Sequence, residues 1–156
     1  MQTSSTVPEL VATAQANAAD LMADIQQADG DDLTAIIVTL ELAAIDVFSA
    51  FESRMQHHFK RGPFSRKLKN KLLDAGKSEL AHRVHQYYLA INVLKHGTGA
   101  SFRELRDDQG SMFSLRPATD IGDEGAETVG LIDVTIDGFF DGLTQTVLDA
   151  YNFLEN

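Results

Sequence analysis

Apolar side chains recur every three or four positions along most of this chain, which is the period of an amphipathic helix. The first such stretch starts at Thr6-Val7-Pro8-Glu9, a capping box with proline in the first turn, and Gly30 is expected to end it. Its apolar positions share one helical face: Leu10, Ala14, Ala18, Leu21 and Ile25. We therefore predict a first helix between Thr6 and Gly30.

A second helix is predicted from a cap at Asp31 or Asp32 to about residues 58–60, and Gly62-Pro63 closes it. Its apolar stripe is wide: Leu33, Ile36, Ile37, Leu40, Ala44, Val47, Phe48, Phe51 and Met55. The β-branched run at residues 36–39 would suit a strand, but the longer helical period outweighs it.

Two more helices are expected to follow this turn. Residues 64–75 form a short basic helix that Gly76 breaks or bends. Its apolar residues are Leu68, Leu72 and Leu73. Ser78 is placed to cap the next helix, which ends at His96, and Gly97 suits the position just after a helix. The core face of this helix is predicted to be Leu80, Val84, Tyr87, Ile91 and Leu94.

The chain changes character after this helix. Ser101-Phe102-Arg103-Glu104 has the pattern of a second capping box that opens a short helix. Residues 107–127 are rich in glycine and acidic residues and poor in apolar ones, which is typical of a long loop. A short strand at 112–115 would pair with a second strand at 130–134, unless the latter is the first turn of the last helix.

The last predicted helix has Asp133 or Thr135 as its cap and carries Ile136, Phe139, Phe140, Leu143, Val147, Tyr151 and Leu154. Gly138 and Gly142 weaken it by roughly 1 kcal/mol each in helix propensity, so core packing must stabilise it. The 156 residues are thus expected to form a single all-α domain, 1–156. We predict a bundle of four main helices with a short extra helix, a long loop and, as an option, a minor β-hairpin.

Charge is segregated along the chain, whose net charge is −10. All 13 Lys and Arg lie between Arg54 and Arg116 with 5 acidic residues, a net of +8, so the two flanks together carry −18. Seven basic residues fall within Lys60–Lys77. Such a block is usually a solvated helix face, and the alternative is a surface that contacts a phosphate backbone. The overall acidity argues against non-specific nucleic-acid binding by the whole surface.

Composition narrows the class of protein. The chain has no cysteine, which excludes disulfides and thiolate metal sites. We expect no apolar run to be long enough to span a bilayer, and residues 1–5 lack the features of a signal peptide, so we expect a cytoplasmic protein that does not enter a membrane.

One stripe of polar residues stands out on the 78–96 helix. His85, Asn92 and His96 fall on one line of the helix, away from the core face, with Leu89 among them. An imidazole can transfer protons and an amide can orient a ligand or contact phosphate. The structural alternative is that Asn92 and His96 satisfy the helix end and nearby backbone groups.

Metal binding has weak support from spacing. His82 and His85 are three residues apart and His57-His58 are adjacent, but none of them belongs to a His-Glu-x-x-His motif. We therefore expect no metal and no other cofactor.

The run Asn92-Val93-Leu94-Lys95-His96-Gly97 resembles the signature helix of HEPN (higher eukaryotes and prokaryotes nucleotide-binding) domains. The resemblance implies a small all-α bundle of the kind found in toxin–antitoxin and antiphage systems, where many members are metal-independent ribonucleases that act as dimers. The family motif is an Arg, commonly followed by Asn, with a His a few residues beyond. The longer string Asn92–Ser101, with residues 130–134 before a Phe-containing helix, is also similar to uncharacterised bacterial proteins.

Ile91 stands where the family has its Arg. In the family, that Arg would stabilise the phosphate charge that builds during 2′-hydroxyl attack, while the His moves a proton. A substitute cation would be Lys95, Arg103 or a residue of a partner subunit. His96 and Asn92 are thus the candidate catalytic residues, and His85, Lys95, Arg103 and Ser101 the candidate binding residues.

Two functions follow from this departure. The missing Arg and the acidic flanks favour a non-enzymatic helical module that binds a protein partner or itself. The alternative is a divergent metal-independent ribonuclease in which basic residues steer RNA. The family implies a homodimer, and the wide apolar stripe of the second helix fits one, although burial on one side explains the stripe equally well.

Overall fold

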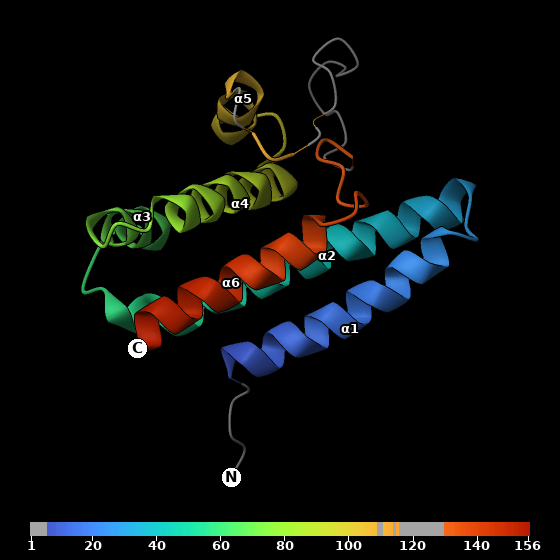
Figure 1. Ribbon diagram of the computed structural model, residues 1–156. Helices are drawn as coiled ribbons and strands as arrows, with labels where there is room; N and C mark the ends of the chain where they lie inside the picture. The colour runs from blue at the N-terminus through green and yellow to red at the C-terminus, as the bar shows by residue number, and fades with distance from the viewer. Residues whose placement is uncertain (1–5, 109–110, 114, 116–129) are drawn as a thin grey trace.

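The computed structural model describes residues 6–108, 111–113, 115 and 130–156, which form an all-α bundle (Figure 1). The predicted fold class is confirmed. The helices are α1 (Val7–Ile25), α2 (Gly30–Met55), the 3₁₀ helix η1 (Gln56–His58), α3 (Phe64–Asp74), α4 (Ser78–His96), α5 (Ala100–Asp107) and α6 (Phe139–Glu155). In the described residues, the predicted β-hairpin is reduced to an isolated antiparallel bridge between Leu115 and Ile132.

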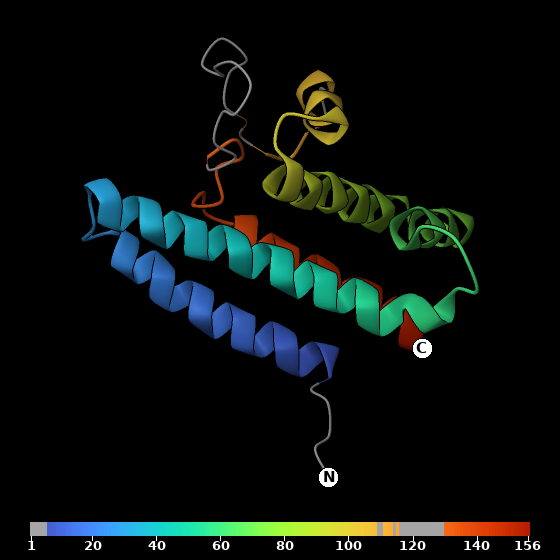
Figure 2. The ribbon, with the colours of Figure 1, turned by 180° about the vertical axis from the view of Figure 1, so that it is seen from behind.

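The helices pack around a core to which almost every element contributes. α1 and α2 form an antiparallel pair, and α6 packs against α1, α2 and α4 (Figures 1 and 2). α3 and α5 each pack on α4. The largest fully buried side chains include Leu40, Phe48, Phe51, Leu68, Tyr87, Phe102 and Leu143. α4 is the helix that links the two sides of the bundle, since it contacts α2, α3, α5 and α6.

The start of α1 agrees with the sequence analysis, but its end does not. The Thr6 hydroxyl accepts a hydrogen bond from the backbone N–H of Glu9 at 3.3 Å. Gly30 does not end this helix: α1 stops at Ile25 and Gly30 is the first residue of α2. Asp31 and Asp32 were predicted to cap α2 but lie in its first turn, where a carboxylate interacts favourably with the helix dipole.

Two other predicted caps are also wrong. Ser78 is the first residue of α4 and Lys77 occupies the cap position; the Lys77 N–H bonds to Leu72 O in the α3–α4 turn. Ser101 lies inside α5, whose cap residue is Gly99. The Ser101 hydroxyl bonds to α4 instead, as described below.

The last helix begins later than predicted. α6 starts at Phe139, so Ile136 lies outside it. The Asp133 side chain accepts hydrogen bonds from the N–H and hydroxyl of Thr135, which closes a local turn and leaves neither residue as the helix cap. Gly138 precedes the helix with φ +90°, a conformation that favours glycine. The 130–134 segment is therefore not the first turn of α6.

One segment corrects an expectation about membranes. The helical stretch Gly30–His58, 29 residues, is long and apolar enough to cross a bilayer by length and composition. The prediction that no apolar run reaches this length is wrong. In the bundle, 28 % of the most apolar 18-residue part of this stretch is buried.

Candidate functional site

α4 places the residues of the candidate site at its C-terminal end. Tyr88, Asn92 and His96 are spaced four residues apart and so share one face of the helix. Gly97 ends α4 with φ +79°, and the chain turns at once into α5. The turn closes a hollow of about 370 Å³ lined by Tyr88, Asn92, His96, Gly97, Gly99, Ala100 and Ser101. The polar stripe predicted from the sequence therefore borders a real concavity at two of its three members.

Asn92 and Ser101 hold this hollow together. The Asn92 amide donates a hydrogen bond to Ser101 Oγ at 3.2 Å, which ties the first turn of α5 to α4. Both side chains are half-buried. The amide therefore already has one structural partner, and a ligand would have to share it or use its oxygen.

His96 is exposed at the rim of the hollow. Within the described part of the chain, its ring forms no hydrogen bond or ion pair, and no guanidinium or ammonium group donates to it. The imidazole can thus be reached from solvent, as a proton-transfer group requires. RNA cleavage would need a cation here to stabilise the negative charge that builds on the phosphate. The described residues place no such cation in hydrogen-bond contact with His96.

The other candidate binding residues are directed elsewhere. His85 Nε2 donates to Glu104 Oε2 on α5 at 2.7 Å, and Tyr88 stacks against the His85 ring with centroids 6.3 Å apart. Lys95 is exposed and its charge acts on Glu52 of α2. Arg103 is exposed on α5 and does not line the hollow. The structure brings together His96, Asn92 and Ser101 but not the other three.

The position of Leu89 explains why the polar stripe is interrupted. This residue lies at the edge of the stripe, beside His96 on the helical wheel, but it is 3 % exposed. The five residues predicted as the core face of α4 are all buried, so that prediction is confirmed. Because α4 is surrounded by other helices, its polar residues emerge only at gaps between neighbours.

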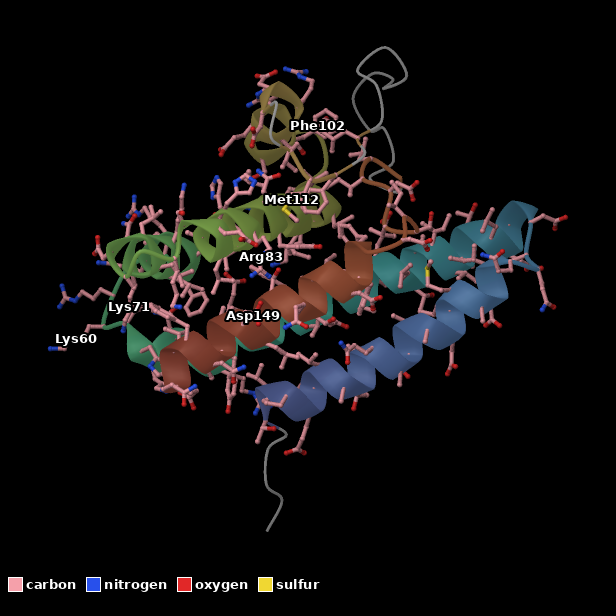
Figure 3. All side chains as sticks on the ribbon, viewed as in Figure 1. Lys60, Lys71, Arg83, Phe102, Met112 and Asp149 are labelled. Carbon is pink, nitrogen blue, oxygen red and sulfur yellow. The ribbon has the colours of Figure 1, made fainter. Side chains whose placement is uncertain are left out.

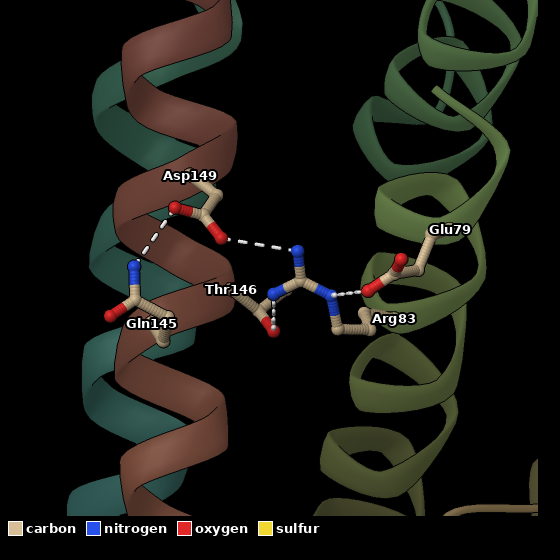
Figure 4. A network of polar contacts seen from close by, with 5 residues as sticks. All are labelled: Glu79, Arg83, Gln145, Thr146 and Asp149. Carbon is tan, nitrogen blue, oxygen red and sulfur yellow. Dashed lines mark hydrogen bonds and ion pairs between the residues drawn. The ribbon is translucent and has the colours of Figure 1, made fainter. Parts of the chain in front are cut away.

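A second polar cluster joins α4 to α6 and was not found from the sequence. Arg83 donates to Asp149 Oδ2 at 3.1 Å and to Thr146 Oγ1 at 3.3 Å, and its Nε lies 3.9 Å from Glu79 Oε1 (Figure 4). A cavity of about 750 Å³ lies beside it, lined by residues that include Lys77, Asn152 and Phe153. Both hydrogen-bond acceptors of Arg83, Thr146 and Asp149, are on α6, so the cluster is a helix–helix contact. Spacing could not reveal it because Asp149 is far away in sequence.

The basic block of residues 60–77 spans the segment that follows η1, helix α3 and the turn between α3 and α4. Six of its seven basic side chains are exposed and Lys69 is half-buried. Lys60 projects away from the bundle at this end, while Lys71 Nζ sits 5.8 Å from the centroid of the Phe59 ring (Figure 3). Most of the block is a solvated face, but Lys60, Arg61 and Lys67 line a hollow of about 520 Å³ together with His58 and Phe59.

The largest apolar exposure lies on α2. No residue between Gly30 and Thr39 is buried, although Leu33, Ile36, Ile37 and Val38 lie there. Leu42 is 53 % exposed, more than the other exposed large hydrophobic residues Leu73, Met112 and Ile136. We define the outer face of α2 as Ala35, Val38, Thr39, Leu42 and Asp46, of which all but the half-buried Val38 are exposed. This helix is seen in front of the bundle, with α1 below it, in Figure 2.

No protein-family model matches the chain, and neither the curated proteins nor the solved structures contain a significant match to it.

Proposed function

We propose that this chain is a non-enzymatic, HEPN-like interaction module that binds a second copy of itself through the outer face of α2. The observation that carries the proposal is the exposure of the outer face of α2, where Leu42 is 53 % exposed and neither Ala35, Val38 nor Thr39 is buried. Removing apolar surface from water contributes about 25 cal/mol per Å², and the part that exceeds the cost of association stabilises an assembly. A helix face of this kind is therefore stabilised when a partner covers it.

The pattern of the outer face supports a second copy as the partner. Ala35 and Leu42 are seven residues apart, and Val38 lies one turn before Leu42, a spacing typical of helices that pack side by side. A two-fold contact uses the same patch on both copies. Such a patch must therefore contact the same patch on the second copy without bringing like charges together.

The charges of α2 meet that requirement. Between Leu33 and Ile45 the only charged residue is Glu41. Its side chain is 5 % exposed and accepts a hydrogen bond from the Gly130 N–H at 3.0 Å, so it points into the bundle. The exposed carboxylate on this face is Asp46, one turn after Leu42. An antiparallel two-fold contact centred near Leu42 places Asp46 opposite Val38 of the second copy, so the two Asp46 carboxylates stay apart.

The opposite face of α2 argues for a docked helix and against one that crosses a membrane. Leu40, Phe48 and Phe51 are each at most 1 % exposed, packed into the bundle core. A membrane-crossing α2 would have to leave α1, α4 and α6 and expose these contacts.

Sedimentation velocity of the untagged protein over a concentration series tests the proposal. Leu42→Glu places a charge in the outer face, and Leu73→Glu is the matched control on exposed α3. We expect the wild type and Leu73→Glu to sediment as dimers and Leu42→Glu as a monomer. A wild type that stays monomeric at every concentration, or two variants that behave alike, would overturn the proposal.

A second candidate function is a divergent metal-independent ribonuclease. One observation favours it: the same hollow is lined by Asn92 and His96, and the imidazole is exposed. The test is incubation of the protein with RNA in EDTA, comparing the wild type with His96→Ala and with His82→Ala, a histidine exposed elsewhere on α4. Cleavage lost only in His96→Ala supports the enzyme and contradicts the non-enzymatic proposal. Absence of cleavage by the wild type removes this candidate.

A further inference from the structure

Three potential metal ligands meet where the end of α2 lies beside the end of α6. His57 and His58 belong to η1, directly after α2, and Glu155 is the last residue of α6. One ligand atom from each of the three side chains lies within 4.8 Å of the other two. Figures 1 and 2 show the C-terminus beside this end of α2.

The hydrogen bond of His57 matches that of a metal-binding histidine. His57 Nδ1 lies 2.9 Å from the Arg54 carbonyl oxygen, which can only accept, so Nδ1 carries the proton and Nε2 of the neutral ring has a free lone pair. Donation of the second ring nitrogen to a backbone carbonyl is the usual way in which a metal-binding histidine is oriented.

His58 and Glu155 are already paired. His58 Nε2 donates to Glu155 Oε2 at 2.6 Å, and the proton in this bond occupies the place that a cation would take. In a tetrahedral zinc site the ligand atoms are about 3.3 Å apart, as follows from metal–ligand distances of about 2.0–2.1 Å. Since all three side chains are exposed or half-buried, small rotations of their side chains can reach that spacing.

We propose that His57, His58 and Glu155 bind a divalent transition-metal ion, zinc by preference. Two imidazoles and one carboxylate are a ligand set that zinc accepts, and the chain has no thiolate to compete with them. Three protein ligands leave one position for water or an anion. His58 also lines a cavity of about 520 Å³ with Phe59, Lys60, Arg61 and Lys67, from which an anion can reach the ion.

The ion would join two segments that are far apart in the chain. It would pin the last turn of α6 to the end of α2, so binding is expected to raise the melting temperature. The nearby basic side chains oppose the approach of a cation. We therefore expect affinity in the micromolar rather than the nanomolar range.

The test is isothermal titration of zinc chloride into the untagged full chain, with cobalt absorption spectra as an independent readout of coordination geometry. We expect one zinc per chain, a tetrahedral cobalt spectrum and a rise in melting temperature. His57→Gln and His58→Gln are each expected to weaken zinc binding at least about tenfold. Glu155→Gln is expected to act in the same direction while keeping an acceptor for His58.

His82→Gln is the matched control, because it removes an exposed histidine outside the cluster. It is expected to leave zinc affinity unchanged. Circular dichroism of each variant separates loss of the site from loss of the fold. The proposal is overturned if the wild type binds no zinc, or if the cluster variants bind zinc as tightly as the wild type and His82→Gln do.

Discussion

The Tyr87 hydroxyl on α4 lies directly against Gly142 on α6, and it donates a hydrogen bond to the Phe139 carbonyl at 2.9 Å. A Cβ added at Gly142 would overlap the hydroxyl oxygen. The Tyr87 ring itself would remain at ordinary contact distance, with Cζ at 3.5 Å. The glycine that weakens α6 as a helix is therefore the residue that lets α4 and α6 pack closely.

Gly142→Ala is expected to lower the free energy of unfolding in the wild-type background. Alanine gains about 1 kcal/mol of helix propensity, but forcing a side chain into a packed core costs about 1–3 kcal/mol. In a Tyr87→Phe background the overlapping oxygen is absent, so Gly142→Ala is expected to be neutral or stabilising. Urea unfolding of the four proteins measures this. An equal cost of Gly142→Ala in both backgrounds would show that the hydroxyl is not the obstacle.

Glu52 is expected to make stability depend on pH. Burial raises the pKa of the Glu52 carboxyl above its ordinary value of 4.5, although a hydrogen bond from Ser65 and the charge of Lys95 act to lower it. The folded chain therefore holds this proton more tightly than the unfolded chain. The resulting stabilisation is complete below the unfolded pKa and is lost as pH rises through the folded pKa.

Glu52→Gln removes this titration while keeping a polar partner for Ser65. We expect its melting temperature to exceed that of the wild type at about pH 7.5 and the difference to shrink toward about pH 5. Thermal unfolding followed by circular dichroism at both pH values checks this. A difference that grows as the pH falls would contradict the sign.

Arg83 and Asp149 are expected to be energetically coupled. Their hydrogen-bonded ion pair is partly screened, with side-chain exposures of 24 % and 34 %. We expect a double-mutant cycle of Arg83→Met and Asp149→Asn to give a coupling of about 1 kcal/mol. Glu79 is the control partner, because it is 89 % exposed and 3.9 Å from Arg83 Nε. Its cycle is expected to give a value near zero, and equal couplings for the two acids would contradict the account.

The helices were predictable because the apolar period extends over many residues. The core face of α4 and the Thr6 cap follow directly from local spacing. The caps failed where distant contacts compete with local ones: Ser101 bonds to Asn92 on another helix, and Asp133 closes its own turn with Thr135. A capping motif indicates which local hydrogen bonds a side chain can form, but it does not show which residues from other helices compete for that side chain.

The site residues were predictable only in part for the same reason. Asn92, His96 and Ser101 come together because they are close in sequence on either side of one turn. Glu155 lies 97 residues from His58, so no spacing rule could join it to the histidine pair. The exposure of apolar residues on α2 could not be predicted either, because an apolar stripe has the same sequence pattern whether its own bundle or a partner covers it.

Cross-linking through a single introduced cysteine tests the proposed α2 contact most directly, since the chain has no cysteine of its own. In a two-fold dimer centred near Leu42, the two copies of Leu42→Cys face each other and are expected to form an intermolecular disulfide rapidly under mild oxidation. Leu73→Cys, equally accessible on α3, is expected to remain largely monomeric. Equal and slow cross-linking of the two variants would contradict self-association through the outer face of α2.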